Sequence, residues 1–141
     1  MIQKPRFFIL EEVVPKSVFQ RYGDQSDKLW GCMDARVLWT ADALRKRYGP
    51  MVANTWHNGG THQYRGFRPF EVNLGAALSQ HRYGRALDLV PSQTTAEEIR
   101  QDILKHPDWD EFKWIRCIEE GVSWLHFDCR NWIGSILVVK P

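Results

Sequence analysis

The sequence predicts an α+β fold: a small, mainly antiparallel sheet with flanking helices. The chain has 141 residues, of which 43% are hydrophobic and 26% charged, as expected for one globular core. Its helix-like and strand-like segments do not alternate as in a parallel α/β protein, and two strands near the C-terminus are predicted to form a hairpin. No repeat or linker divides the chain, so residues 1–141 are expected to form one domain, and nothing requires more than a monomer.

The first half of the chain predicts one long helix, one short strand and a long irregular segment. Residues 33–48 place apolar side chains at helical spacing, and Gly49-Pro50 ends that helix. Residues 51–56 are expected to form a strand. Residues 57–78 are rich in Gly, Asn, Arg and His, a composition typical of a functional loop.

The second half predicts a second helix among several strands. Thr95 and Glu98 match the capping-box pattern at the start of a helix over residues 96–105. The strands expected here are residues 85–90, 113–119, 124–129 and 136–139, with a turn at residues 120–123.

Charge and hydropathy exclude several classes of protein. The formal net charge is +2 and the basic residues are scattered, which argues against nucleic acid as a partner. No apolar run approaches the ~20 residues that span a bilayer, so no membrane partner is expected. The short apolar stretch near the N-terminus runs into Glu11 and Glu12, which predicts synthesis in the cytoplasm without a signal peptide.

The cysteine count argues against a disulfide framework. There are three cysteines and no C-x-x-C pair, so free thiols are the default expectation and a cysteine zinc site is not expected. A bridge between Cys117 and Cys129, on neighbouring predicted strands, stays open.

The segment 79–88, S-Q-H-R-Y-G-R-A-L-D, carries the strongest chemical signal. His81 lies before a predicted strand and Asp88 lies on it, with Gly84 allowing a sharp turn between them. Imidazole and carboxylate groups are common zinc ligands. The alternative is structural, with Asp88 pairing with Arg82 or Arg85.

A second motif, W-L-H-F-D, supplies a third ligand. On a strand, Trp124, His126 and Asp128 face the same side. Two His and one carboxylate leave a coordination position open, which is typical of a catalytic zinc site. His126 is therefore the predicted third ligand; Asp128 either orients a ligand or pairs with Arg130. The same ligand set accepts cobalt or manganese.

The motif S-x-H-x-x-G-x-A-x-D followed by a C-terminal His resembles the zinc peptidases of the D-Ala-D-Ala carboxypeptidase and L-Ala-D-Glu endopeptidase kind. That group includes phage endolysins and shares its fold with the hedgehog signalling domain. The likeness covers roughly residues 52–130. It implies Zn²⁺ held by His81, Asp88 and His126, a peptidoglycan peptide as substrate, and action in the bacterial cell wall or periplasm.

The resemblance also implies roles for residues around the ligands. Arg68, in G-F-R-P, matches an arginine of the family and is expected to steady negative charge on the substrate; Arg65 is the alternative. Ser79 and Trp124 are expected to contact substrate. His57 and His62 flank the glycine-rich loop; they line the cleft, replace one of the predicted ligands or are exposed.

One position departs from the family pattern. Many members carry Glu three residues before the last His, and Ser123 stands there in this chain. The hedgehog-like spacing points to Glu120 as the general base, with Glu119 in reserve. If neither carboxylate serves, the alternative is an inactive zinc-containing module that binds peptidoglycan or a partner protein.

Overall fold

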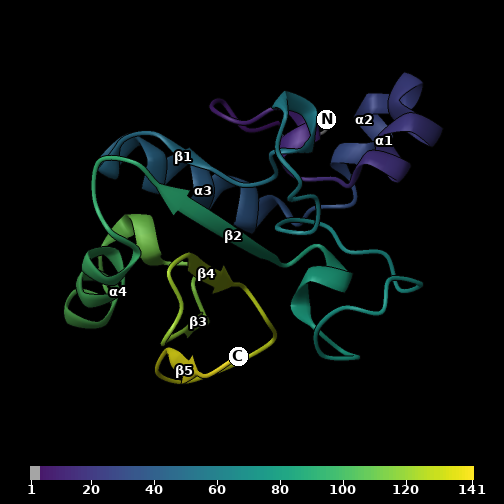
Figure 1. Cartoon of the computed structure of the whole chain (residues 1–141). Helices are drawn as coiled ribbons and strands as arrows, with labels where there is room; N and C mark the ends of the chain where they lie inside the picture. The colour runs from purple at the N-terminus through teal and green to yellow at the C-terminus, as the bar shows by residue number, and fades with distance from the viewer. Residues whose placement is uncertain (1–3) are drawn as a thin grey trace.

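The computed structural model describes residues 4–141 and has an α+β fold built on a five-stranded sheet (Figure 1). The strand order is β1-β2-β4-β3-β5. The strands are β1 (Met51–Val52), β2 (Ala86–Pro91), β3 (Cys117–Glu119), β4 (Leu125–Asp128) and β5 (Leu137–Val139).

The sheet is mixed, whereas the sequence predicted a mainly antiparallel one without specifying a parallel strand. The pairs β1–β2, β2–β4 and β3–β4 are antiparallel, and β5 runs parallel to β3. β5 follows β4 in the chain but pairs with β3, which lies between them in the sheet, so β5 does not form a hairpin with its predecessor. Hydrogen bonds from Leu137 N to Arg116 O (2.9 Å) and from Glu120 N to Val139 O (2.9 Å) fix its position.

The helices are α1 (Lys16–Tyr22), α2 (Ser26–Trp30), α3 (Ala35–Tyr48) and α4 (Ala96–Lys105). The predicted helix 33–48 is confirmed as α3; it begins two residues later because the Asp34 side chain accepts the Arg36 N–H as the N-cap. The prediction for α4 is confirmed with its capping box. The sequence analysis did not predict α1 or α2.

The two faces of the central strands differ in character. Leu87 and Leu89 of β2 and Phe127 of β4 are buried in the hydrophobic core, which also contains the apolar sides of α3 and α4. Alternation along the same strands turns Asp88 and His126 to the other face. Asp88 and His126 therefore lie on strands whose opposite face packs into the hydrophobic core.

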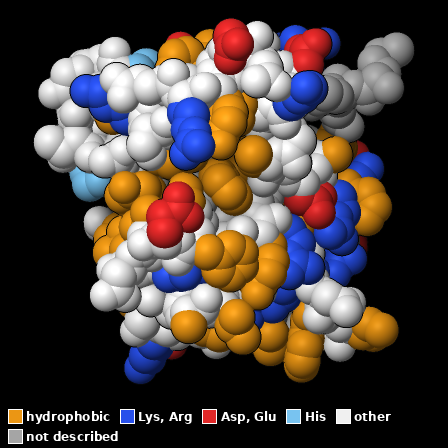
Figure 2. Space-filling view, turned by 90° about the vertical axis from the view of Figure 1, so that its right-hand side faces the viewer, with side chains coloured by type: hydrophobic (Ala, Val, Ile, Leu, Met, Phe, Trp, Pro, Cys, Tyr) orange, Lys and Arg blue, Asp and Glu red, His pale blue; other side chains and the backbone are white. Residues whose placement is uncertain are grey.

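Residues 57–85 run largely outside regular structure, interrupted by short 3₁₀ helices at Trp56–Asn58 and Gln80–Tyr83. In Figure 1 this teal segment extends to the right of β2. Figure 2 views the molecule from that side, where hydrophobic side chains gather beside Lys and Arg side chains. Exposed apolar side chains of this segment are Phe70, Leu74, Leu78 and Tyr83.

Within residues 4–141, no helix combines the length and apolar character needed to cross a bilayer. Cys32, Cys117 and Cys129 are free thiols, so the bridge left open above does not form. Burial raises the pKa of both Cys117 and Cys129 to about 12.

Candidate metal centre

His81, Asp88 and His126 converge on one point. Each offers a ligand atom, and these atoms lie within 4.8 Å of one another. The 3₁₀ helix Gln80–Tyr83 carries His81, while β2 and β4 carry the other two. Asp88 and His126 are direct cross-strand partners, so the sheet register itself brings them together.

Two local features orient His81. Its Nδ1 lies 2.8 Å from the Gly66 carbonyl oxygen, which can only accept, so Nδ1 carries the proton and Nε2 presents a lone pair. Gly84 makes the turn into β2 with φ 67°, and a side chain there would collide with the Cys32 carbonyl. Both the ring tautomer and the turn thus aim His81 at Asp88.

The contact between His81 and Asp88 fits a bound cation. His81 Nε2 lies 3.3 Å from Asp88 Oδ1. With Nδ1 protonated, both facing atoms are acceptors, and only a proton or a metal ion between them makes the approach favourable. A lone-pair nitrogen and a carboxylate oxygen are donors that divalent transition metals accept.

His126 is held between two carboxylates. Its Nδ1 lies 2.8 Å from Asp88 Oδ1 and its Nε2 3.0 Å from Asp128 Oδ2. Asp128 is fully buried and also accepts from Arg130 Nε at 2.8 Å and Nη2 at 2.7 Å. Asp128 therefore makes both contacts weighed for it: it orients the His126 ring, as carboxylates behind metal-binding histidines do, and it pairs with Arg130.

The electrostatics of the cluster follow from these contacts. Burial alone would raise the pKa of Asp88, but the imidazoles of His81 and His126 outweigh it and hold that pKa well below the usual range. Burial alone would lower the pKa of His126, yet hydrogen bonds to Asp128 and Asp88 raise it to about 9. The site therefore favours a positive charge at its centre.

Glu119, rather than Glu120, lies beside these ligands. Continuing the β3–β4 register from Ile118↔Phe127 puts Glu119 opposite His126, and its Oε1 is 3.9 Å from His126 Nδ1. Glu120 is the next residue, just past the end of β3, and it is exposed. Of the two carboxylates weighed from the sequence, Glu119, the reserve, is the one that lies beside the cluster.

A groove of about 490 Å³ reaches the cluster at Asp88, whereas His81 and His126 are not among the residues that line it. Among the predicted residues, Arg65, Arg68 and Trp124 line it, together with Ser123. The remaining lining residues are Thr61, His62, Gln63, Tyr64 and Leu74.

Arg68 brings a buried positive charge to this groove. Its side chain is 8% exposed, and its Nε has no hydrogen-bond partner among residues 4–141. Burial lowers the pKa of Arg68, while the negative charges of Asp88 and Glu119 act in the opposite direction. Arg65 is tied to the scaffold instead: its Nη1 donates to the Ala53 carbonyl at 2.9 Å, and its own carbonyl accepts from Asp88 N at 2.8 Å.

The structure does not bring every predicted residue into the groove. Ser79 caps the 3₁₀ helix, with its Oγ accepting from His81 N at 3.4 Å, and does not line the groove. His62 lines it, whereas His57 does not. Alternation along β3 was the signal that could have ranked Glu119 above Glu120, since Glu119 shares a face with Cys117, the cross-strand partner of Asp128.

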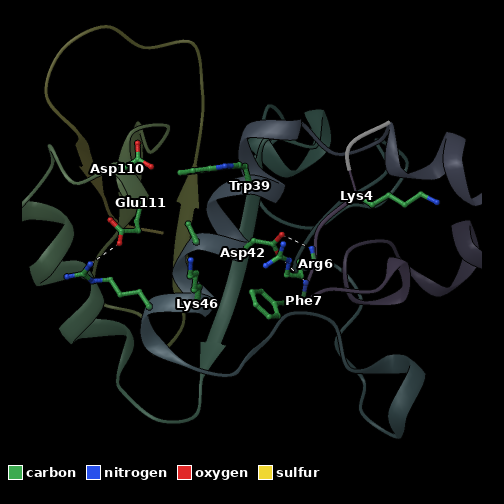
Figure 3. A pocket seen from close by; sticks show the side chains of 10 residues that line it. Lys4, Arg6, Phe7, Trp39, Asp42, Lys46, Asp110 and Glu111 are labelled. Carbon is green, nitrogen blue, oxygen red and sulfur yellow. Dashed lines mark hydrogen bonds and ion pairs between the residues drawn. The ribbon is translucent and has the colours of Figure 1, made fainter. Parts of the chain in front are cut away.

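A larger hollow of about 680 Å³ lies elsewhere, between α3, the N-terminal segment and residues 110–111 (Figure 3). Its acidic groups have partners of their own. Asp42 accepts the backbone N–H groups of Arg6 and Phe7, and Glu111 pairs with Arg47 at 2.8 Å. None of the predicted site residues lines it.

Comparison of the chain with protein-family models, with curated proteins and with solved structures gives no match in any of the three.

Proposed function

We propose that this chain is a zinc-dependent peptidase that hydrolyses peptide bonds in the stem peptides of bacterial peptidoglycan. The observation that carries the proposal is the convergence of His81, Asp88 and His126 beside a groove that Asp88 and Arg68 line. The motif resemblance supplies the finer detail: a hedgehog/D-Ala-D-Ala peptidase-like fold, D-Ala-D-Ala carboxypeptidase or L-Ala-D-Glu endopeptidase activity, and an endolysin-like role.

The zinc ligands would be His81 Nε2, a carboxylate oxygen of Asp88 and His126 Nδ1. When bound, zinc would supply a Lewis acid and lower the pKa of water from ~16 toward ~7. Gly66 and Asp128 keep the two imidazole rings oriented by accepting their other N–H groups.

The remaining steps fall to Glu119 and Arg68. Glu119 is 21% exposed and borders the cluster, so it can take a proton from water and return it to the leaving amine. Arg68 brings a fixed positive charge to the groove, where negative charge develops on the attacked carbonyl oxygen. Trp124 offers an aromatic wall against which a substrate can pack.

The direct test is release of new amino groups from purified peptidoglycan by zinc-loaded protein, with and without a chelator, followed by mass spectrometry of the products. We expect chelator-sensitive release, restored by added zinc and absent in His81→Ala. The product masses identify the bond that is cleaved.

The second candidate is an inactive zinc-containing binding module, favoured by Ser123 in the position where the resembling family commonly has Glu. Zinc-loaded, folded protein that sediments with peptidoglycan but releases no amino groups would establish that function instead of hydrolysis.

A further inference from the structure

Two of the segments that line the groove are each held by hydrogen bonds from one buried arginine. Residues 69–78 form one wall through Leu74, residues 120–124 form a second through Ser123 and Trp124, and residues 61–65 form a third. None of these segments is helix or strand. One buried arginine holds each of the first two walls by donating hydrogen bonds from both terminal nitrogens to the backbone carbonyls of two residues that are two positions apart.

Arg100 of α4 holds the second wall. It is 5% exposed, and its Nη1 and Nη2 each lie 2.9 Å from a carbonyl oxygen, those of Trp124 and Val122. Its Nε also donates to Glu97 at 2.8 Å. Every nitrogen position of this guanidinium is therefore engaged, and its charge is paired.

Arg82 holds the first wall. It is 9% exposed, and its Nη1 and Nη2 lie 2.8 Å and 2.9 Å from the carbonyl oxygens of Phe70 and Val72. Its Nε is buried without a partner in the described part of the chain. Arg82 directly follows the ligand His81, so it joins this wall to the metal centre.

The first wall in turn holds Arg68. The Leu74 carbonyl accepts from Arg68 Nη1 at 3.2 Å, and Leu74 N donates to the Val72 carbonyl at 3.0 Å. At Gly75, with φ 72°, an added Cβ would lie 2.6 Å from Arg68 Nη1. Arg68 Nη2 donates to the Tyr64 carbonyl at 3.3 Å, outside this wall. Its Nη1 packs closely against the segment whose carbonyls at Phe70 and Val72 bind Arg82.

We propose that Arg82 is a positioning residue that fixes the wall 69–78 and, through it, the Arg68 guanidinium. This inference rests on the proposed peptidase function for its effect on turnover, although its structural part does not. A guanidinium forms a planar fork that a lysine ammonium cannot reproduce, so Arg82→Lys keeps the charge but loses the paired contacts.

The test is a double-mutant cycle on zinc-loaded protein. Since a displacement of ~1 Å costs up to ~10²-fold in rate, we expect Arg82→Lys to lower kcat/KM by about 10- to 100-fold, mainly through kcat. In an Arg68→Lys background, the same change should have little further effect. Arg116→Lys is the control for loss of a guanidinium elsewhere: Arg116 donates through Nη1 alone to the carbonyls of Lys113 and Ile115, and it does not line the groove. Additive losses in the cycle would overturn the proposal.

Amide hydrogen exchange separates this inference from the proposed function. Arg82→Lys should accelerate exchange by about tenfold at Val72 and Leu74, whose amides are hydrogen-bonded within the wall, but not at Glu120 in the second wall. Unchanged exchange at Val72 and Leu74 would contradict the role of Arg82 whether or not the wild type hydrolyses peptides. If the exchange pattern is as expected but the wild type shows no turnover, only the proposed peptidase function is contradicted and the structural role of Arg82 stands.

A second variant covers the case in which Arg82→Lys does not fold. Gly75→Ala perturbs Arg68 from the other side and leaves Arg82 in place. We expect it to lower kcat in the wild-type background and to have little effect beside Arg68→Lys. A full loss that persists in both backgrounds would show that the wall acts independently of Arg68.

Discussion

The strands and the loops deliver their functional groups by different means. Asp88, His126 and Glu119 form one row across β2, β4 and β3, placed there by hydrogen-bond register and side-chain alternation. His81 and Arg68 come from irregular segments and depend on distant contacts, such as Gly66 with His81 and Leu74 with Arg68. The positions of the strand-borne groups therefore follow from strand pairing, whereas those of the loop-borne groups depend on contacts within the irregular segment 57–85.

Removing a candidate metal ligand should have the largest effect on zinc binding and turnover, and it should distinguish strand-borne from loop-borne groups. His126→Ala and His81→Ala should both abolish stoichiometric zinc binding and turnover. His126→Ala should also destabilise the metal-free protein by about 3–5 kcal/mol, because it leaves Asp88 and Asp128 without their shared partner. His81→Ala should cost much less.

Zinc stoichiometry and urea unfolding of the metal-free variants measure both effects. Equal unfolding free energies for the two variants would contradict the division into strand-borne and loop-borne groups, and a full equivalent of zinc in either would remove that residue from the ligand set.

The two neighbouring carboxylates test alternation along β3. Glu119→Gln should retain zinc and lower kcat by about 10²–10⁴-fold, since it removes the proton acceptor beside His126. Glu120→Gln is the matched control and should have near wild-type kinetics, because Glu120 is exposed and lies just past the end of β3. A loss of kcat in Glu120→Gln but not in Glu119→Gln would identify Glu120 as the general base.

The sequence predicted elements with strong local signals and missed those set by distant contacts. The bounds of α4 follow from its Thr95–Glu98 capping box, and the α3 prediction differed only at its start. The parallel placement of β5 depends on pairing with β3, for which no local pattern exists. The short helix α1 buries no residue fully, so it lacks the apolar periodicity that identifies a helix.

Within the site, too, local patterns were sufficient for some residues and not for others. A spacing motif was enough to select His81, Asp88 and His126, since two of them lie on strands and the third lies one tight turn away. It was not enough to find Arg82 or Arg100, whose partners lie 10 to 24 residues away in loops. Carbonyl acceptors are common to all residues and leave no signature in the sequence.

The raised pKa of His126 gives zinc binding a definite pH dependence. Because this pKa is about 9, zinc must displace a proton at lower pH, and its affinity should fall about 50-fold between pH 9 and pH 7. Folding raises this pKa above the ordinary ~6.5, so the proton stabilises the metal-free protein below that pH, and the contribution is lost as pH rises through about 9.

Competition with a chelator of known affinity at pH 7, 8 and 9 measures this dependence. A pH-independent affinity would show that His126 is already neutral in the metal-free protein.

Asp128→Asn should weaken zinc binding by about 10- to 100-fold without abolishing it. The amide can still accept from the His126 ring, but it no longer offers a full negative charge to that ring or to Arg130. Isothermal titration with zinc measures the change. Asp128→Asn would also leave Arg130 without its ion pair, so Arg130→Gln in the Asp128→Asn background controls for that second effect. If the weaker zinc binding comes only from the lost Arg130 ion pair, Asp128 does not support zinc binding through the His126 ring.

The smallest effect is expected at Ser79, where a cap and a substrate contact predict different outcomes. As a cap, Ser79 accepts from His81 N in a long hydrogen bond of 3.4 Å, so Ser79→Ala should cost about 1 kcal/mol of stability or less and leave KM unchanged. As a substrate contact, it would raise KM with little change in stability. Thermal unfolding and steady-state kinetics on one cleaved peptide distinguish the two. A raised KM would mean that the loop carrying His81 reaches into the groove when substrate binds, and that the loop-borne half of the site rearranges while the strand-borne half stays fixed.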